Sequence, residues 1–222
     1  MSNPDVATTR FVLETVATEV LANEAYFGEL DAVVGDGDFG FSLARGFEKV
    51  LESLADYPAD SVAALLQAAA VTISSRIGGT SGPIWGTAFL RAAMTAKGVE
   101  RVDGQAVVAM LRAAAEGIQA RGKAELGDKT LLDALVPATD ALAAAVGEGA
   151  DSHAALERFA TEMRAAAERT AALQARRGRA SYSGERSVGS PDAGAIALAV
   201  LAEALLRRWP ERAGLEEPSR KE

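Results

Sequence analysis

Apolar side chains recur at helical spacing along most of this chain, and few segments alternate between apolar and polar residues as strands do. Near its beginning one apolar stripe is formed by Leu13, Val16, Ala17, Val20 and Leu21. Alanine is abundant and long stretches lack glycine and proline, which favours helices because alanine has the highest intrinsic helix propensity. The pattern predicts an all-α protein with eight helices, at about residues 5–26, 41–54, 61–76, 83–97, 103–120, 131–146, 152–175 and 193–208.

The last predicted helix differs from the others because apolar residues surround most of its axis and only Glu203 interrupts them. A helix that is apolar all round is central in the fold or lies at an oligomer interface. Pro137 is expected to kink the sixth helix or to mark its real start. We expect one domain over residues 1–209 and a charged, frayed tail over residues 210–222.

Composition and charge exclude several classes of protein. The chain has 222 residues, a formal net charge of −8, no cysteine and one histidine. This excludes a disulfide scaffold, a thiolate or multi-histidine zinc site and a cysteine nucleophile. The acidic balance argues against nucleic-acid binding, and no apolar run reaches the roughly 18–20 residues that span a bilayer. The polar N-terminus predicts no secretory signal, so we expect a cytoplasmic protein with no nucleic-acid or membrane partner.

Glycines and charged residues gather in four predicted loops, which alternate along the chain. These loops are residues 31–40, 78–82, 122–129 and 178–194. In an up-and-down bundle every second connection lies at the same end. The four loops are therefore expected to converge on one rim and to form one site.

The first loop carries three carboxylates, Asp31, Asp36 and Asp38, with glycines that let the chain turn tightly between them. Carboxylate oxygens are the hard ligands that Mg²⁺ or Ca²⁺ prefers. An ordinary Asp-Gly surface turn is the alternative interpretation. An EF-hand is excluded, because Phe47 stands where its bidentate glutamate belongs.

The second loop, Gly78-Gly79-Thr80-Ser81-Gly82-Pro83, leads directly into a predicted helix. Backbone N–H groups at a helix N-terminus attract phosphate, and glycine permits a close approach. The loop lacks the Gly-Lys-Ser/Thr of a Walker A motif and the preceding strand of a dinucleotide-binding motif, so a simple helix–helix turn remains the alternative. An acidic loop opposite a phosphate-binding loop implies a metal ion between them, most simply a Mg²⁺–nucleotide.

The third and fourth loops contain basic residues for which two interpretations stay open. Lys129 could hold phosphate as a point charge and Arg179 or Arg186 as a forked donor, or each could be an exposed loop residue. His153 is expected on the surface of the opposite rim, and no Ser–His–Asp set fits the converging loops. Trp85 is expected to anchor the core, with a place in the pocket wall as the alternative.

Four motifs stand in these loops: Gly35-Asp36-Gly37-Asp38; Gly78-Gly79-Thr80-Ser81-Gly82-Pro83; Gly127-Asp128-Lys129-Thr130-Leu131-Leu132-Asp133-Ala134-Leu135; and Gly178-Arg179-Ala180-Ser181-Tyr182 with Gly184-Glu185-Arg186-Ser187. In order and spacing, from about residue 5 to residue 209, the chain resembles the nucleotide-binding L domain of dihydroxyacetone kinases. This resemblance implies an eight-helix antiparallel up-and-down barrel with the nucleotide site at one end.

The same resemblance implies that Asp31, Asp36 and Asp38 hold two Mg²⁺ ions, which bridge to the phosphates of ADP or ATP. The residues that it places around the nucleotide are Phe39, Gly40, Phe41, Ser42, Gly79, Thr80, Ser81, Gly122, Leu131, Arg179, Pro191 and Asp192. Two positions depart from the family: Phe39, where histidine or another small polar residue is common, and Ser190, where histidine is frequent. No residue is expected to act as a catalytic nucleophile, because metal ions and donor groups neutralise the phosphoryl oxygens.

The implied activity is that of a kinase subunit, which passes the γ-phosphoryl group of its nucleotide to dihydroxyacetone or a related short ketose. The ketose is held on a separate K-type subunit. A phosphotransferase-system phosphocarrier (M-type) subunit is a second expected partner if it rephosphorylates bound ADP, and exchange with ATP is the other possible source of phosphate. A homodimer is also expected. The alternatives are the nucleotide-binding part of a fatty-acid kinase system and a non-catalytic nucleotide- or metal-sensing module that regulates a partner protein.

Overall fold

The computed structural model describes residues 3–212, and this part of the chain contains helices and loops but no strand. Its nine α-helices are α1 (Pro4–Ala22), α2 (Glu24–Ala32), α3 (Phe39–Ser53), α4 (Val62–Arg76), α5 (Ser81–Ala96), α6 (Gly104–Gly122), α7 (Leu132–Gly147), α8 (Ser152–Arg169) and α9 (Ala193–Arg208). A 3₁₀ helix covers Arg179–Ser187. The prediction of an all-α protein is confirmed.

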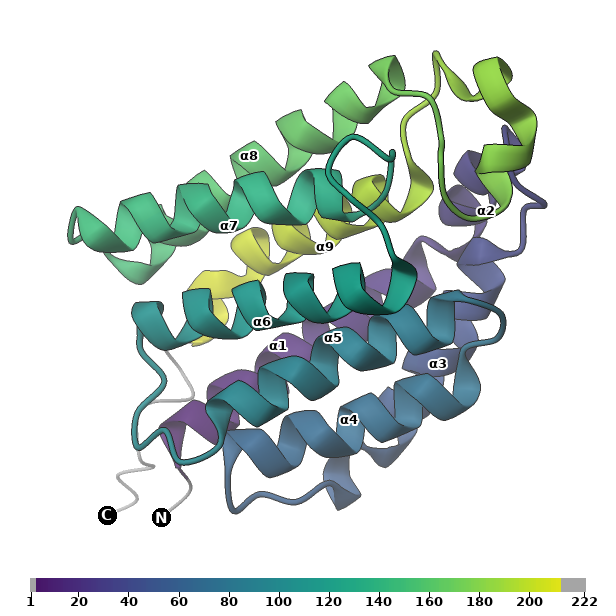
Figure 1. Cartoon of the computed structure of the whole chain (residues 1–222). Helices are drawn as coiled ribbons and strands as arrows, with labels where there is room; N and C mark the ends of the chain where they lie inside the picture. Colours follow the sequence, from purple (N-terminus) through teal and green to yellow (C-terminus); the bar gives the residue numbers. More distant parts are fainter. Residues whose placement is uncertain (1–2, 213–222) are drawn as a thin grey trace, which may run out of the picture.

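The long helices run alternately up and down, as Figure 1 shows. Contacts join α1 to α3, continue from α3 to α9 in chain order, and return from α9 to α1, so the long helices close a ring. The connections that precede α3, α5, α7 and α9 therefore lie together at one end of the molecule (Figure 1). The short helix α2 lies at this same end, against α3.

Several helix starts follow directly from the local sequence. In five of them a side-chain oxygen of the preceding residue accepts a hydrogen bond from a backbone N–H group in the first turn, which is the preferred N-cap arrangement. The capping residues are Asn3, Ser61, Asp103, Asp151 and Asp192. The expected cap at Asp103 is among them.

The first predicted helix is divided at Asn23, which corrects the expected count of eight. The backbone N–H group of Asn23 donates to the Glu19 carbonyl oxygen (3.1 Å) and so does its side-chain amide (2.9 Å). These bonds end α1, and α2 then continues to Ala32. Asp31 therefore lies in the last turn of a helix, not in the loop where the sequence predicted it.

The end of α8 differs from expectation, whereas α7 agrees with the predicted range 131–146. α8 ends at Arg169 because buried Thr170 turns its hydroxyl group back to the Ala167 carbonyl oxygen (2.5 Å). The same hydroxyl accepts the N–H of Asp192 (2.8 Å), which ties the end of α8 to the start of α9. α7 begins at Leu132 and contains Pro137 in its interior, so Pro137 does not mark its start.

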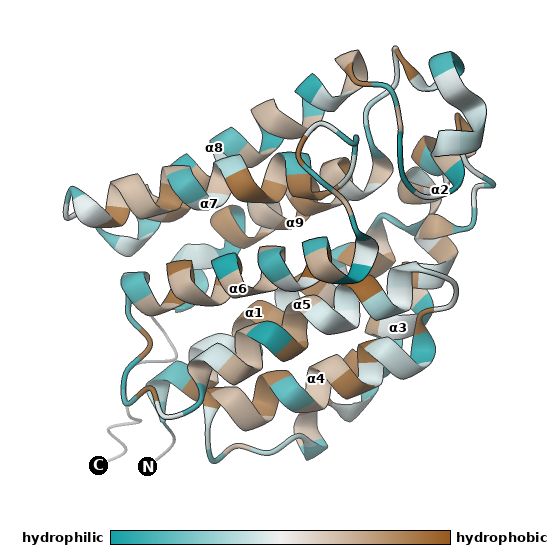
Figure 2. Cartoon of the chain, in the orientation of Figure 1, coloured by the Kyte–Doolittle hydropathy of each residue, from teal (hydrophilic) through white to brown (hydrophobic). Residues whose placement is uncertain are grey.

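The core is built from small and medium apolar side chains with a few aromatic anchors. Trp85 is buried and meets the fully buried ring of Phe47 edge to face, with 5.9 Å between the ring centroids. This confirms its role as a core anchor. Figure 2 shows that the helices carry most of the strongly apolar residues.

The nearly uniform apolar surface of α9 is covered by several helices of the same chain. It contacts α1, α2, α7 and α8 within the same chain. Its one acidic side chain, Glu203, accepts two hydrogen bonds from the guanidinium group of Arg164 on α8, at 2.7 and 2.8 Å. The neighbours of α9 within the chain thus account for its composition.

Over residues 3–212 no helix is both long enough and apolar enough to cross a bilayer. Residues 209–212 form a short 3₁₀ helix, in which the Arg212 guanidinium lies over the Trp209 ring. The rest of the expected tail, residues 213–222, lies outside the described residues.

Candidate functional site

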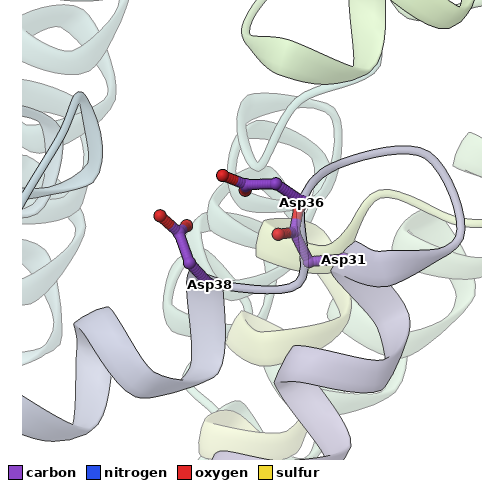
Figure 3. Close-up of side chains that lie close together, drawn as sticks. All are labelled: Asp31, Asp36 and Asp38. Atoms are coloured by element: carbon purple, nitrogen blue, oxygen red, sulfur yellow. The ribbon is translucent and has the colours of Figure 1, made fainter.

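Three carboxylates meet at the end of the molecule where the four loops lie. Asp31 belongs to the last turn of α2, Asp36 to the following turn, and Asp38 immediately precedes α3. One ligand atom from each of these side chains lies within 4.8 Å of the others. Figure 3 shows the three side chains gathered around the turn that joins the two helices.

Glycines allow this close approach. Gly37 has a φ of +76°, which favours glycine, and its N–H group donates to Asp31 Oδ2 (2.9 Å). A Cβ atom at Gly35 would collide with the Asp31 carboxylate, and one at Gly40 would collide with the Glu24 carbonyl oxygen of α2. The crossing of α2 and α3, and with it the spacing of the carboxylates, therefore depends on glycine at these positions.

Arg179 comes from 141 residues further along the chain to reach these carboxylates. Its Nη1 atom donates to Asp38 Oδ2 (2.9 Å) and forms an ion pair with Asp36. A Cβ atom built on Gly79 would lie 3.9 Å from Arg179 Nη2, so the second loop is adjacent. Ser183, four residues after Arg179, donates its hydroxyl to the Val34 carbonyl oxygen (3.2 Å). The structure thus brings the first, second and fourth loops together.

The second loop forms the N-terminus of α5. Gly79 has a φ of +62°, Thr80 is exposed, and Ser81 begins the helix. Within the described residues no side chain caps this helix end. The first N–H groups of α5 and two hydroxyl groups consequently stand beside Arg179 and the carboxylates, where an anion can accept their hydrogen bonds.

Lys129 in the third loop is buried, which overturns both interpretations of it as a phosphate ligand or an exposed residue. Its ammonium group donates to the Leu173 carbonyl oxygen (3.0 Å) and to the carbonyl oxygen of Ser187. Burial lowers the pKa of the Lys129 amine. The side chain thus points into the protein and holds the backbone of the fourth loop.

Asp128, its neighbour, is also buried and fixes another part of the fourth loop. Its Oδ2 atom accepts hydrogen bonds from the Glu125 N–H group (2.9 Å) and from Arg177 Nε (2.8 Å). The hydrogen bond from Arg177 lowers the pKa of the Asp128 carboxyl group. The order of the fourth loop therefore depends on charged side chains in the third.

Asp192 closes the site beside the start of α9. Burial, reinforced by the carboxylates of Asp133 and Asp31, raises the pKa of Asp192 to about 7 against the opposing hydrogen bond from the Ala195 N–H group. A cation bound among these carboxylates favours the ionised form of Asp192.

Other residues predicted around the nucleotide are placed as follows. Leu131 and Gly122, two of the predicted positions, lie at the end of the molecule that carries the carboxylates. Leu131 adjoins the start of α9, because a Cβ atom built on Gly194 would lie 3.4 Å from Leu131 Cβ. Gly122 adjoins α5, because a Cβ atom built on Gly122 would lie 3.3 Å from Ile84. Pro191 lies next to Asp192 and is half-buried, and Ser42 is half-buried in the first turn of α3. Ser190 has a buried hydroxyl group without a hydrogen-bond partner among the described residues.

The two phenylalanines before Ser42 do not both face the carboxylates. Phe39 packs against the core, with its ring centroid 6.3 Å from that of Phe27. Phe41 is exposed and lies beneath the Arg45 guanidinium (5.7 Å). The Phe39 side chain is thus half-buried and packs toward the core, whereas that of Phe41 points into solvent. His153 is exposed at the start of α8, at the opposite end, as expected.

The donor set suits a hard divalent cation with an anionic ligand. Three carboxylates within 4.8 Å of one another supply oxygen ligands, and Mg²⁺ is usually bound through carboxylates together with substrate phosphates. Arg179 and the N-terminus of α5 supply donors for those phosphates on the adjoining side. The chemistry of these residues therefore fits a Mg²⁺–polyphosphate.

The family profile of the DAK2 domain matches residues 33–207, which include Asp36, Asp38 and the four loops apart from the first two residues of the first loop. This chain belongs to the DAK2-domain family. It is 38% identical over 180 residues to the ADP-binding subunit of the PEP-dependent dihydroxyacetone kinase of Escherichia coli, an alignment covering 81% of this chain and 86% of that subunit. It is also 41% identical over 197 residues to the L-erythrulose 1-kinase of Mycolicibacterium smegmatis, covering 87% of this chain but only 34% of that longer kinase.

The solved structures agree with the sequence comparison. The dihydroxyacetone kinase of C. freundii, crystallised with AMP-PNP and Mg²⁺, superposes with a TM-score of 0.75 at 26% identity. The match covers 93% of this chain and 34% of that protein. The DAK2 domain here thus corresponds to one part of a larger kinase that binds a magnesium nucleotide.

The sequence did not reveal the supporting residues of the site. Asp133 accepts hydrogen bonds from the N–H groups of Gly127 (2.5 Å) and Thr130 (2.8 Å), which shapes the turn before α7. Thr170 and Lys129 join backbone segments that are far apart in sequence. A carboxylate three residues after Thr130 is a local signal for such a turn, whereas nothing local marks the partners of Thr170 or Lys129.

Proposed function

We propose that this chain binds a Mg²⁺–adenine nucleotide and serves as the phosphoryl-transfer subunit of a dihydroxyacetone kinase. The single observation that carries the proposal is the meeting of Asp31, Asp36 and Asp38 with Arg179 beside the N-terminus of α5. Three carboxylates alone repel phosphate, and a cationic side chain and a helix N-terminus alone repel a metal ion. Together they match the two charges of a metal–nucleotide pair.

Each group then has a defined task. Asp31, Asp36 and Asp38 hold the metal, which we propose to be two Mg²⁺ ions, and Thr80, Ser81 and the first N–H groups of α5 bind phosphate oxygens. Bound Mg²⁺ neutralises charge on the phosphoryl oxygens and on the ADP leaving group. Arg179 adds positive charge on the same side. The chain supplies no nucleophile, because the hydroxyl group of the ketose attacks the phosphorus.

The remaining predicted positions enclose the nucleotide itself. Gly122 and Leu131 border the site from the third loop, and Pro191 with Asp192 borders it from the start of α9. The residues from Phe39 to Ser42 form the first turn of α3. We propose that these positions line the nucleotide, with Phe39 acting through its backbone.

The ketose and its subunit are expected to meet the chain at this same end. Four exposed apolar side chains stand on the loops there, which are Val33, Leu126, Tyr182 and Val188. Tyr182 is 89% exposed, although it lies only three residues from Arg179. Such side chains around a charged site suit a partner protein, and we assign them to a K-type subunit that holds dihydroxyacetone or a related short ketose.

The name of the Escherichia coli relative and its PEP dependence favour a phosphocarrier (M-type) subunit as the phosphate donor over exchange with ATP. A homodimer and a cytoplasmic location, where adenine nucleotides are available, complete the proposal. The longer relatives named as erythrulose kinases act on another short ketose. The acceptor is therefore tested with several short ketoses, dihydroxyacetone and erythrulose among them.

The proposal is tested in two steps. Mass spectrometry and metal analysis of the purified protein are expected to find ADP together with magnesium. The chain is then mixed with a K-type subunit and a ketose, with ATP or a phosphorylated M-type subunit as donor, and transfer is expected only when the K-type subunit is present. Nucleotide binding without transfer under either donor refutes the kinase assignment and favours a non-catalytic nucleotide sensor.

A further inference from the structure

Lys129 occupies an unusual position for a lysine. Its side chain is only 3% exposed, and its backbone has a φ of +62°, a conformation that costs about 1 kcal/mol or more outside glycine. Burying a charged amine is also unfavourable unless hydrogen bonds compensate it. The structure provides that compensation through two carbonyl oxygens rather than through an ion pair among the described residues.

Those two carbonyl groups belong to the first and last residues of one segment, residues 173–187. Lys129 Nζ donates to Leu173 at its start and to Ser187 at its end. Ser187 Oγ also accepts the N–H of Ala175 (2.8 Å) and donates to the Gly184 carbonyl oxygen (2.6 Å). The ammonium group therefore holds the two ends of the segment together at its base.

Arg179 lies near the middle of the same segment. Residues 176–179 are exposed, and the only regular structure here is the 3₁₀ helix Arg179–Ser187, which is interrupted at Gly184. A segment of this kind has few buried apolar contacts to fix its backbone, so its position depends on polar anchors. Lys129 holds the base of the segment. Asp128 holds its side, where the backbone carbonyl oxygen accepts the Arg176 N–H (3.0 Å) and the carboxylate accepts Arg177 Nε (2.8 Å). The Ser183 hydroxyl group adds one hydrogen bond to the Val34 carbonyl oxygen of the first loop (3.2 Å).

Hydrogen bonds within the third loop hold the turn that directs the Lys129 side chain into the protein. Asp133 accepts hydrogen bonds from the N–H groups of Gly127 and Thr130, on either side of the lysine. These bonds hold the turn in which Lys129 adopts its positive φ. A continuous chain of contacts thus leads from α7, through Lys129 and segment 173–187, to Arg179 and the carboxylates.

We propose that Lys129 is a positioning residue for the nucleotide site, which closes the base of segment 173–187 and thereby places Arg179 against Asp36 and Asp38. The lysine does not touch the phosphates; it acts through Arg179. This inference rests on the proposed function only in naming the ligand, because the closure of the segment is a property of the protein alone.

Lys129→Met is compared with Lys123→Met. Lys123 is a matched control because it lies in the same loop and also has a positive φ (+50°), but its side chain is exposed. The first measurement is limited digestion with trypsin, mapped by mass spectrometry. Cleavage after Arg176, Arg177 and Arg179 is expected to be at least about tenfold faster in Lys129→Met than in the control, because the local opening free energy falls. Equal cleavage rates in the two variants overturn the proposal.

The second measurement is the Mg²⁺–ADP affinity by titration calorimetry, in a cycle with Arg179→Ala. Lys129→Met is expected to weaken binding about tenfold in the wild-type background and less than about twofold in the Arg179→Ala background, since coupled residues are non-additive. Equal losses in both backgrounds show that Lys129 acts independently of Arg179 and overturn the inference.

Failure of the wild-type chain to bind the ligand and failure of the variant to fold are distinguished from failure of the positioning role. If the wild-type chain does not bind Mg²⁺–ADP, the proposed function fails, while the digestion still decides whether Lys129 closes the segment. If circular dichroism shows that Lys129→Met does not fold, Lys129→Gln takes its place. Glutamine is shorter and uncharged, and a folded Lys129→Gln with wild-type digestion and affinity rejects the positioning role.

Discussion

At the scale of single residues, the site is a balance of charges held at short range. Asp31, Asp36 and Asp38 have the same sign and lie within 4.8 Å of one another, an arrangement that is unfavourable unless cations are present. Arg179 supplies one positive charge to two of them. A divalent metal ion would offset the remaining excess of negative charge, so under the proposed function the carboxylates are expected to be indispensable for ligand binding.

Asp36→Ala is therefore expected to purify without nucleotide and to bind Mg²⁺–ADP more than about 100-fold more weakly than the wild type. Changes to residues around a metal's ligands alone typically cost 10–100-fold in affinity, and loss of a ligand costs more. Mass spectrometry of the purified protein and titration calorimetry measure the effect. Asp60→Ala, which removes an exposed carboxylate from the loop before α4, is the control and should bind normally. Normal co-purification of nucleotide with Asp36→Ala would contradict the assignment of this ligand.

At the scale of elements, the site depends on how closely neighbouring helices approach. α2 and α3 cross at Gly40, whose α-carbon faces the backbone of α2 at Glu24 and Gly28. α8 and α9 are joined by the hydrogen-bonded pair of Arg164 and Glu203. The first contact fixes α2 against α3, between which the three carboxylates lie. The second contact fixes α9, which begins after Asp192, against α8.

Gly40→Ala is expected to separate α2 from α3 and so to move Asp31 away from Asp38. The added methyl group collides with backbone atoms, which cannot yield as a flexible side chain does, so unfolding should become easier by about 1–3 kcal/mol. Mg²⁺–ADP affinity, measured by calorimetry, should fall as well. Gly147→Ala at the end of α7 is the control, because no atom lies within 4 Å of the added Cβ there. Equal affinity in the two variants would show that the α2–α3 crossing does not set the carboxylate spacing.

Acid should weaken the contact between α8 and α9. The hydrogen bonds from Arg164 lower the pKa of Glu203 below its ordinary value. The stabilisation is therefore complete above the unfolded pKa of about 4.3 and is lost as the pH falls through the lower pKa of the folded protein. Glu203→Gln should lower the melting temperature at pH 7, and this deficit should shrink when both proteins are compared below pH 4. A deficit that stays constant with pH argues against a role for the ionised pair.

At the scale of the whole molecule, one end carries the site and the ring of helices supplies a rigid support. Within residues 3–212 no sheet or second domain holds the four loops, so their order depends on the helices that they join and on side chains such as Lys129 and Asp128. A ligand that contacts several loops at once stabilises the folded state relative to the unfolded chain.

Mg²⁺–ADP at about 100 times its dissociation constant should stabilise the protein by about 2.7 kcal/mol. For a chain of this size that corresponds to a rise of about 5–10 °C in melting temperature. Scanning fluorimetry measures the shift, and EDTA should abolish it because the carboxylates repel phosphate without the metal. A shift with ADP that persists in EDTA would falsify the metal-dependent site. At the same ligand concentration Asp36→Ala should shift by no more than about 1–2 °C without EDTA, because an affinity loss of about 100-fold leaves at most about 0.4 kcal/mol of stabilisation, and it should not shift with EDTA.

Much of the fold follows from the sequence because helices are local structures. The apolar spacing and the capping residues Ser61, Asp103 and Asp192 mark where helices lie and begin. Short connections force neighbouring helices to alternate in direction, so the convergence of the loops at one end also follows. The carboxylate cluster could be expected for the same reason, since its members lie within eight residues of one another.

The tertiary structure alone decided which distant side chains meet. The partner of Arg179 lies 141 residues away, Lys129 turns inward to bond Leu173 and Ser187, and Thr170 ends α8 while it holds Asp192. A charged residue in a loop has the same local sequence whether it is exposed or buried. Whether such a residue is buried depends on the free energy of hydrogen bonds that form only after the helices have packed. For that reason no pattern along the chain could predict its burial.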